Sequence, residues 1–150
     1  MTAPSREVDV RGPRFAAWVT TVVLAVVLLT GSGWLLAAQA VVFAVGAFAG
    51  LRYAPYGVLF RVLVAPRLGP AREREPEAPP RFAQLVGFVF AVVGTVGYLL
   101  SAPLLGAIAT GLALVAALLN AATGFCLGCE MYLLLRRATS PRALPTDAAA

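Results

Sequence analysis

Residues 14–30 read RFAAWVTTVVLAVVLLT and decide the class of fold open to this chain. After Arg14 they contain no charged side chain. A helix of this length, rising about 1.5 Å per residue, nearly crosses a hydrocarbon core of about 30 Å. The rest of the chain suits the same environment, because 60% of its 150 residues are hydrophobic and its mean hydropathy is +0.84. We therefore expect a helix that spans a lipid bilayer.

Three more apolar runs follow, so that the four runs form two pairs. Turn-forming residues separate the two runs of each pair. Residues 31–33, Gly-Ser-Gly, mark a tight turn after the first run, and residues 101–103, Ser-Ala-Pro, mark another after the third. A signal peptide cleaved after Ala40 is not expected, because the next residues form another membrane run. The expected spans are residues 14–30, 34–51, 82–100 and 104–123. This pattern predicts an all-α integral membrane protein.

Small and polar residues inside the expected spans predict close helix packing. Gly46 and Gly50 have the GxxxG spacing, for which packing within the bundle is favoured over dimerisation. Gln39 is expected to make an interhelical hydrogen bond rather than to bind a ligand. Three glycines give the third span one smooth side: Gly87, Gly94 and Gly97.

The segments outside the spans each have their own composition. Residues 1–13 form a polar, poorly ordered tail that Gly12-Pro13 separates from the first span. Residues 58–68 are apolar around Arg61 and too short to cross a bilayer, which is typical of a helix lying in the membrane interface. Residues 66–80 alternate arginine with glutamate among five prolines and predict a solvated linker. Residues 138–150 are expected to be a disordered tail, which leaves residues 14–137 as the membrane domain.

The two pairs of spans resemble copies of one unit. A shift of 67 residues places the Arg-Phe-Ala of residues 14–16 on that of residues 81–83, and places Gly57 on Gly124. In this register residues 58–68 correspond to residues 125–135. The predicted fold is therefore four transmembrane helices arranged as two repeated helical hairpins, each followed by a short cytoplasmic interfacial helix.

The basic residues predict how the chain is oriented. All 12 are arginines, and they lie within residues 6–14, between residues 52 and 81, or after residue 135, whereas the two opposite turns have none. By the positive-inside rule, both termini and the central linker are cytoplasmic. Thiols at the cytoplasmic face are kept reduced by glutathione and thioredoxin, so a permanent structural disulfide is not expected.

Cys126 and Cys129 are the only cysteines of the chain and have the CxxC spacing. An unbroken helix over residues 104–135 would be about 48 Å long, which exceeds the bilayer core, so we expect a break at Gly124. A helix beginning at Phe125 would direct free amides and its positive dipole end toward a thiolate at Cys126.

Glu130 is predicted to share a helical face with both cysteines, together with Leu133 and Arg137. One role for Glu130 is a general base or proton acceptor for thiol exchange, because acids within apolar stretches tend to be functional. The other, slightly favoured, is a salt link to an interfacial arginine. A carboxylate so close would also favour the neutral thiol and so oppose the helix dipole. Two residues near the break are expected to cap the freed backbone: Asn120 and Thr123.

The residue types present exclude several other chemistries. The chain has no histidine, which removes Ser-His-Asp and Cys-His catalysis. Structural zinc normally takes four ligands, so a metal on Cys126 and Cys129 is an alternative that requires a dimer or a partner. The arginines flank apolar spans and are not interleaved with exposed aromatic residues, which argues against nucleic-acid binding. No pattern specifies an organic cofactor.

Two stretches resemble a bacterial, mostly actinobacterial, membrane family known as domain of unknown function 4395: RGPRFAAWVT at residues 11–20 and NAATGFCLGCEMY at residues 120–132. The similarity covers about residues 8–137. It implies the membrane fold and location and the importance of Cys126 and Cys129, but no established activity. Members look to be associated with thioredoxin-like and rhodanese-like proteins, which points to thiol or sulfur chemistry.

The leading hypothesis is a protein of the cell (inner) membrane that presents Cys126 and Cys129 for thiol-disulfide exchange or sulfur relay. Its partner would be a soluble thioredoxin-like or rhodanese-like protein, with Cys126 attacking and Cys129 resolving the mixed disulfide. The alternative is a non-catalytic scaffolding protein of the bilayer in which the pair packs or binds a metal.

Overall fold

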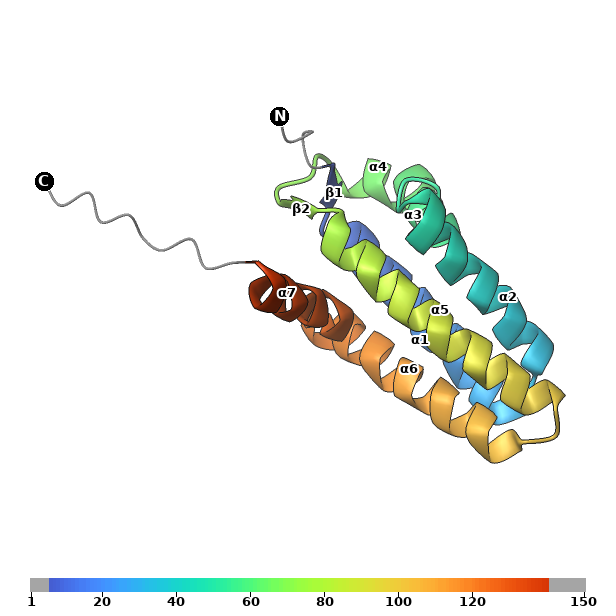
Figure 1. Ribbon diagram of the computed structural model, residues 1–150. Coiled ribbons are helices and arrows are strands. Elements are labelled where there is room, and N and C mark those ends of the chain that lie inside the picture. The colour runs from blue at the N-terminus through green and yellow to red at the C-terminus, as the bar shows by residue number, and fades with distance from the viewer. Residues whose placement is uncertain (1–5, 141–150) are drawn as a thin grey trace, which may run out of the picture.

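The computed structural model of this protein describes residues 6–140, in which four long helical segments run side by side and the short elements gather at one end (Figure 1). The long segments are α1 (Arg11–Thr30), α2 (Gly33–Ala44) continued by the π-helical turn η1 (Val45–Ala49), α5 (Ala78–Leu99) and α6 (Pro103–Thr123). The short elements are β1 (Glu7–Asp9), α3 (Pro55–Leu59), η2 (Phe60–Val64), α4 (Ala65–Leu68), β2 (Arg74–Pro76) and α7 (Leu127–Thr139). The prediction of a helical fold is confirmed.

Prolines and glycines set the ends of the long helices. Pro13, Pro79 and Pro103 each lie in the first turn of a helix, where a missing N–H removes no helical hydrogen bond. Consequently α1 and α5 begin three and four residues before the predicted starts. At its other end, α1 stops at Gly31, whose φ of 64° is left-handed and whose N–H donates to the Val27 carbonyl at 2.7 Å.

The membrane-spanning potential of these segments differs. Within residues 6–140, three helices are long and apolar enough to cross a bilayer: α1, α5 and α6. The segment Gly33–Ala49, which joins α2 and η1, is apolar but shorter. Many large apolar side chains of the long segments point outward, including Val22 at 61% exposure and Leu112 at 55%. Such a surface is suited to lipid contact.

Helix α5 packs against both α2 and α6, and α1 packs against α6. Two α5 glycines face side chains of α2: a Cβ at Gly87 would lie 2.8 Å from the Phe43 ring, and a Cβ at Gly94 would lie 2.7 Å from Leu36. Gly97 instead faces α6, where an added Cβ would lie 2.6 Å from the Gly106 nitrogen. The predicted glycine side of this helix is therefore divided between two neighbours.

Gly46 and Gly50 do not act together as a packing motif. Gly46 faces α5, because an added Cβ would lie 2.9 Å from Oε1 of Gln84, so packing within the bundle is confirmed for this residue. Gly50 has a φ of 112° and ends η1, with its N–H donating to the Val45 carbonyl at 3.1 Å. Its role is to adopt a backbone conformation that a side chain would strain.

A buried polar contact joins α2 to α3. Gln39 is 2% exposed, and its Oε1 accepts a hydrogen bond from the Tyr56 hydroxyl at 2.6 Å. The prediction that Gln39 hydrogen-bonds within the bundle is thereby confirmed. Around it lies an apolar core whose members come from all four long segments: Leu24, Val27, Leu36, Ala40, Phe43, Ala91 and Ala113.

Two segments predicted to lack structure pair with each other. β1 and β2 are antiparallel, with Val8 opposite Glu75, and Arg11 forms an ion pair with Asp9 at 2.8 Å. The prediction of an unstructured tail is therefore wrong for residues 6–13, and the linker prediction for residues 66–80 misses β2 and the first turn of α5. Strand pairing satisfies backbone groups that no composition rule could assign to a partner. The predicted tails at residues 1–5 and 141–150 lie outside the described residues.

The segment predicted to be an interfacial helix is helical, but the helical stretch begins earlier and is not uniform. It runs from Pro55 to Leu68 as α3, η2 and α4 in succession. Phe60 anchors it, being 3% exposed and packed against Phe15 of α1 with the rings tilted and their centroids 5.7 Å apart. Val62 and Leu63 point outward.

Candidate functional site

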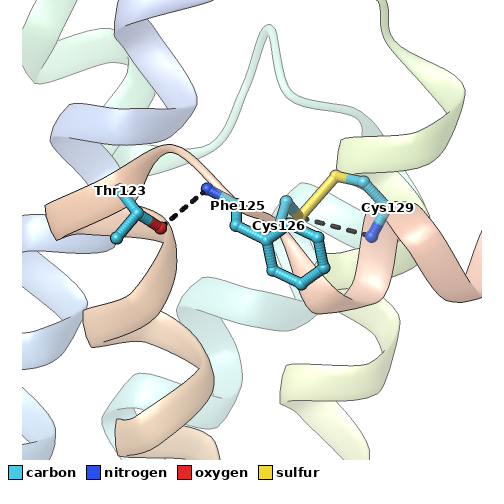
Figure 2. The surroundings of a disulfide bond; sticks show 4 residues. All are labelled: Thr123, Phe125, Cys126 and Cys129. Carbon is cyan, nitrogen blue, oxygen red and sulfur yellow. Dashed lines mark hydrogen bonds between the residues drawn. A yellow bond between two sulfur atoms is a disulfide. The ribbon is translucent and has the colours of Figure 1, made fainter.

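The last long helix ends where the sequence predicts a break. Gly124 has a φ of 77°, and its N–H donates to the Asn120 carbonyl at 2.9 Å. The Thr123 hydroxyl accepts a hydrogen bond from the Phe125 N–H at 3.2 Å (Figure 2). The capping prediction is confirmed for the side chain of Thr123, whereas Asn120 contributes its backbone carbonyl. Together these bonds redirect the chain from α6 into α7.

Cys126 and Cys129 are joined by a disulfide at the start of α7, with their Cα atoms 5.1 Å apart (Figure 2). Cys126 is the N-cap residue and has an extended backbone, and its Sγ accepts a hydrogen bond from the Cys129 N–H at 3.3 Å. The helix therefore begins at Leu127 and not at Phe125, because an extended cap residue precedes it. The structure gives the oxidised form of the pair. That the cytoplasm keeps it reduced stays a prediction.

Gly128, between the two cysteines, brings α7 into contact with α5. A Cβ at this position would lie 2.6 Å from both the Cα and the Cβ of Ala83. Beside this crossing, Tyr132 of α7 and Phe82 of α5 have ring centroids 5.8 Å apart. The cysteine pair is thus held against the first turns of α5 by a contact that has no room for a side chain.

The charges of α7 complement its helix dipole. Glu130 lies in the first turn, and Arg136 and Arg137 lie in the last. Glu130 is exposed, whereas Cys126 and Cys129 are partly buried. Glu130 makes no ion pair with any residue between 6 and 140, so the predicted salt link is not formed in this structure.

The sequence of the chain matches one known protein family. A family model described as Domain of unknown function (DUF4395) matches residues 8–137. The chain belongs to this family. The match includes the four long segments and both cysteines and ends inside α7. No curated protein and no solved structure matches the chain.

In this DUF4395 chain, the helical face predicted to hold both cysteines and Glu130 differs from the prediction in one residue. Cys129, Glu130, Leu133 and Arg137 are helical and spaced as expected, but Cys126 precedes the first helical residue. Its sulfur lies over the helix start, where free N–H groups are concentrated. The helix start can therefore stabilise negative charge on Cys126 more directly than a position within the first turn would allow.

Metal binding by this DUF4395 chain is limited by its ligands. Residues 6–140 contain no group of three or more Cys, Asp or Glu side chains placed to hold a metal ion. A metal on Cys126 and Cys129 would receive two sulfur ligands from the chain, whereas structural zinc usually takes four.

Sequence reasoning missed Gly128 and the aromatic pair Phe82–Tyr132. The glycine is visible in CLGC, since a helix-disfavouring residue between two cysteines suggests a close contact. Its partner Ala83 lies 45 positions earlier in the chain, and no local pattern connects them.

Proposed function

We propose that this DUF4395 protein is a four-span integral membrane protein that exchanges electrons or sulfur with a soluble cytoplasmic partner through Cys126 and Cys129. The observation that carries the proposal is the disulfide at the start of α7, where the Cys129 N–H donates to the Cys126 sulfur. Such an arrangement suits a pair that alternates between disulfide and thiolate.

The path of the chain supports four crossings. α1 and α5 both begin near the end that holds β1 and β2, because these strands pair with each other. If α1 crosses the bilayer, the chain must return before α5 begins. Residues 33–49 form the long helical segment between α1 and α5 and extend about 25 Å. We infer that they make the return crossing.

The position of the arginines supports cytoplasmic termini. The arginine-containing segments gather at the end that holds β1, α3, α4 and α7, and the turns at the other end carry no charge (Figure 1). By the positive-inside rule the arginine end is cytoplasmic. Cys126 and Cys129 would then be accessible to soluble proteins of the cytoplasm.

An internal repeat is supported by two arginines with reciprocal roles. Arg14 at the start of α1 donates to the carbonyls of Ala121 and Ala122 at the end of α6, both at 3.2 Å. Arg81 near the start of α5 donates to the carbonyls of Ala47 and Phe48 in η1, at 2.9 to 3.3 Å. Each hairpin thus caps the helix end of the other.

The helix ends indicate a different repeat register from the one predicted. Gly57 lies within α3, whereas Gly50 and Gly124 both end a long segment with positive φ. α5 is longer than α1, the turn after it is longer than the turn after α1, and α6 is longer than the segment Gly33–Ala49, and these differences together account for the shift. We therefore propose that α3 to α4 corresponds to α7, with Gly50 equivalent to Gly124.

The exchange conserves electrons and protons. A partner thiolate attacks one sulfur of the disulfide and forms a mixed disulfide while the other cysteine leaves as a thiolate. A second partner thiol then attacks the mixed disulfide, so the protein becomes a dithiol with two added electrons and protons, and the partner becomes a disulfide. In the reverse direction, Cys126 attacks and Cys129 resolves. In sulfur relay, the Cys126 thiolate of the reduced pair attacks the outer sulfur of a partner persulfide, the S–S bond of the persulfide breaks, and the partner leaves as a thiolate.

We propose that Glu130 carries out the proton transfer. It is exposed and follows Cys129 in the first turn of α7. In this proposal it accepts the proton of the Cys129 thiol as the resolving thiolate forms. The alternative function, a scaffolding role in which the pair packs or binds a metal, requires neither cysteine to react.

Trapping a mixed disulfide tests the function. Inside-out membrane vesicles carrying Cys129→Ser should retain a partner covalently through Cys126, because the resolving thiol is missing. The partner should be released by dithiothreitol and identified by mass spectrometry.

The variant lacking both cysteines, Cys126→Ser with Cys129→Ser, is the matched control and should retain nothing. If neither Cys129→Ser nor Cys126→Ser traps a protein, and both thiols of the unmodified chain resist alkylation after reduction, the exchange mechanism is wrong and the scaffolding role is favoured.

A further inference from the structure

A second feature of the arginine end is a cavity of about 620 Å³, separate from the cysteine pair. One wall is formed by the segment around β1 and the first turn of α1, and another by α3, η2 and the start of α4. The segment Gly69–Arg74 and the start of α5 close the remaining sides. None of these elements contains a cysteine, so the cavity is independent of the proposed thiol chemistry.

The charged lining of the cavity is positive overall. Five arginines line it, Arg6, Arg11, Arg52, Arg61 and Arg74, with the three acids Glu7, Asp9 and Glu77. Asp9 is neutralised by Arg11, whose guanidinium also lowers the pKa of that carboxyl. Glu77 is 7% exposed, and its Oε1 accepts a hydrogen bond from the Leu51 N–H at 2.8 Å. Apart from the Asp9–Arg11 pair, the cavity is lined by more arginines than acids, because only Glu7 and Glu77 remain on the acidic side.

Apart from Gln84, the remaining lining is apolar, and it lies close to surfaces suited to lipid. Phe60, Ala16, Pro13 and Ala65 line the cavity together with Ala54. Next to it, η2 and α4 expose Val62, Leu63 and Leu68, at 64%, 48% and 54%. A cavity that combines arginines with an apolar wall is complementary to an amphiphile with an anionic head.

We propose that this cavity binds the phosphate headgroup of an anionic phospholipid from the cytoplasmic leaflet, with Arg52 and Arg74 as contacts to the phosphate. The glycerol and the upper acyl chain lie along Pro13 and Ala65. Arginine suits this ligand because its planar guanidinium donates two parallel hydrogen bonds to phosphate oxygens. The inference uses the membrane location in the proposed function and does not depend on the cysteines.

Lipid binding to the purified full chain in detergent tests the proposal. Native mass spectrometry should detect more phosphatidylglycerol than phosphatidylcholine bound at equal concentration, and phosphatidylglycerol should raise the melting temperature more. Arg52→Gln with Arg74→Gln should weaken phosphatidylglycerol binding about tenfold or more, since one lost hydrogen bond to a charged group is worth a factor of about ten.

A matched variant separates site binding from general attraction. Arg67 and Arg72 lie in the same region but do not line the cavity, and Arg67 donates to the Leu63 carbonyl of its own turn. Arg67→Gln with Arg72→Gln removes the same charge and should leave phosphatidylglycerol binding within about twofold, because these arginines are outside the site. Equal losses in the two double variants would overturn the proposal.

Two further measurements keep the test decisive. Arg52→Lys with Arg74→Lys preserves the charge, so it should fold even if the glutamine variant does not, and should keep the lipid preference with reduced affinity. Inorganic phosphate alone should give little stabilisation. If it stabilises as well as phosphatidylglycerol does, or if the two lipids bind equally to the unmodified chain, the phospholipid assignment is wrong.

Discussion

At the scale of single residues, Gly128 has the clearest structural requirement in the candidate site. It lies between the two cysteines and allows α7 to touch the backbone of α5 at Ala83. Gly111 has no such requirement, because an added Cβ there would meet nothing within 4 Å. The two glycines are both helical, so they separate the effect of lost space from the effect of helix propensity.

Gly128→Ala should destabilise the contact between α7 and α5. The added methyl group must displace α7, and overpacking of this kind costs about 1–3 kcal/mol, offset by about 1 kcal/mol of helix propensity. Alkylation of Cys126 and Cys129 after reduction should become faster as α7 moves away. Thermal unfolding in detergent and the rate of maleimide labelling measure the two effects.

Gly111→Ala is the control for that substitution. It should be neutral or stabilising by up to about 1 kcal/mol, because alanine favours the helix and finds open space. Unchanged labelling and stability in Gly128→Ala would show that the crossing at Ala83 is not needed to hold the cysteine pair.

At the scale of elements, the helix ends are joined by long-range contacts. The last carbonyls of a helix have no partners within the helix and need partners from elsewhere. Arg81 satisfies those of η1, and Arg14 satisfies those of α6. Arg81 is partly buried and Arg14 is exposed, so solvent competes more strongly for the second contact.

Arg81→Gln should therefore destabilise the fold more than Arg14→Gln. Hydrogen bonds to charged groups contribute about 1.5–3 kcal/mol, and we expect about 1–2 kcal/mol for Arg81 and less than about 1 kcal/mol for Arg14 after solvent screening. Unfolding in detergent gives the two values. Arg67→Gln, which loses a bond within its own turn, should change stability less than either. An equal loss of stability in all three variants would show that net charge, and not the individual hydrogen bonds, causes the effect.

At the scale of the whole molecule, the bundle has a charged end and an uncharged end. β1, β2, α3, α4 and α7 lie at the first, and the two tight turns of the hairpins lie at the second (Figure 1). Ser101, with a φ of 62°, is exposed in the turn between α5 and α6. It offers a position for a reporter at the uncharged end.

Labelling with a membrane-impermeant maleimide should separate the two ends. Reduced Cys126 and Cys129 should react in inside-out vesicles and not in intact spheroplasts. Ser101→Cys, placed in the variant that lacks both native cysteines, should react from the outside alone. Reaction of both ends from one side would contradict the crossing of α5, and a reversed pattern would contradict the orientation.

Much of the fold could be predicted from local signals. Apolar run length identifies α1, α5 and α6, and Gly31 and Gly124 mark helix ends because they adopt left-handed conformations. The β1–β2 pairing could not be predicted, since a pairing of three residues is selected by where the helices place the strands. For the candidate site, the spacing of Cys126 and Cys129 was visible, but the start of α7 was misplaced by two residues.

The sequence by itself determined the helical class, the tight turn within each hairpin and the spacing of the two cysteines, because each depends on composition or spacing within a few turns of chain. The tertiary structure decided which helices are neighbours, which carbonyls Arg14 and Arg81 reach, and how closely α7 approaches Ala83. These contacts join residues 33 to 108 positions apart, where shape and free hydrogen-bonding groups select the partner.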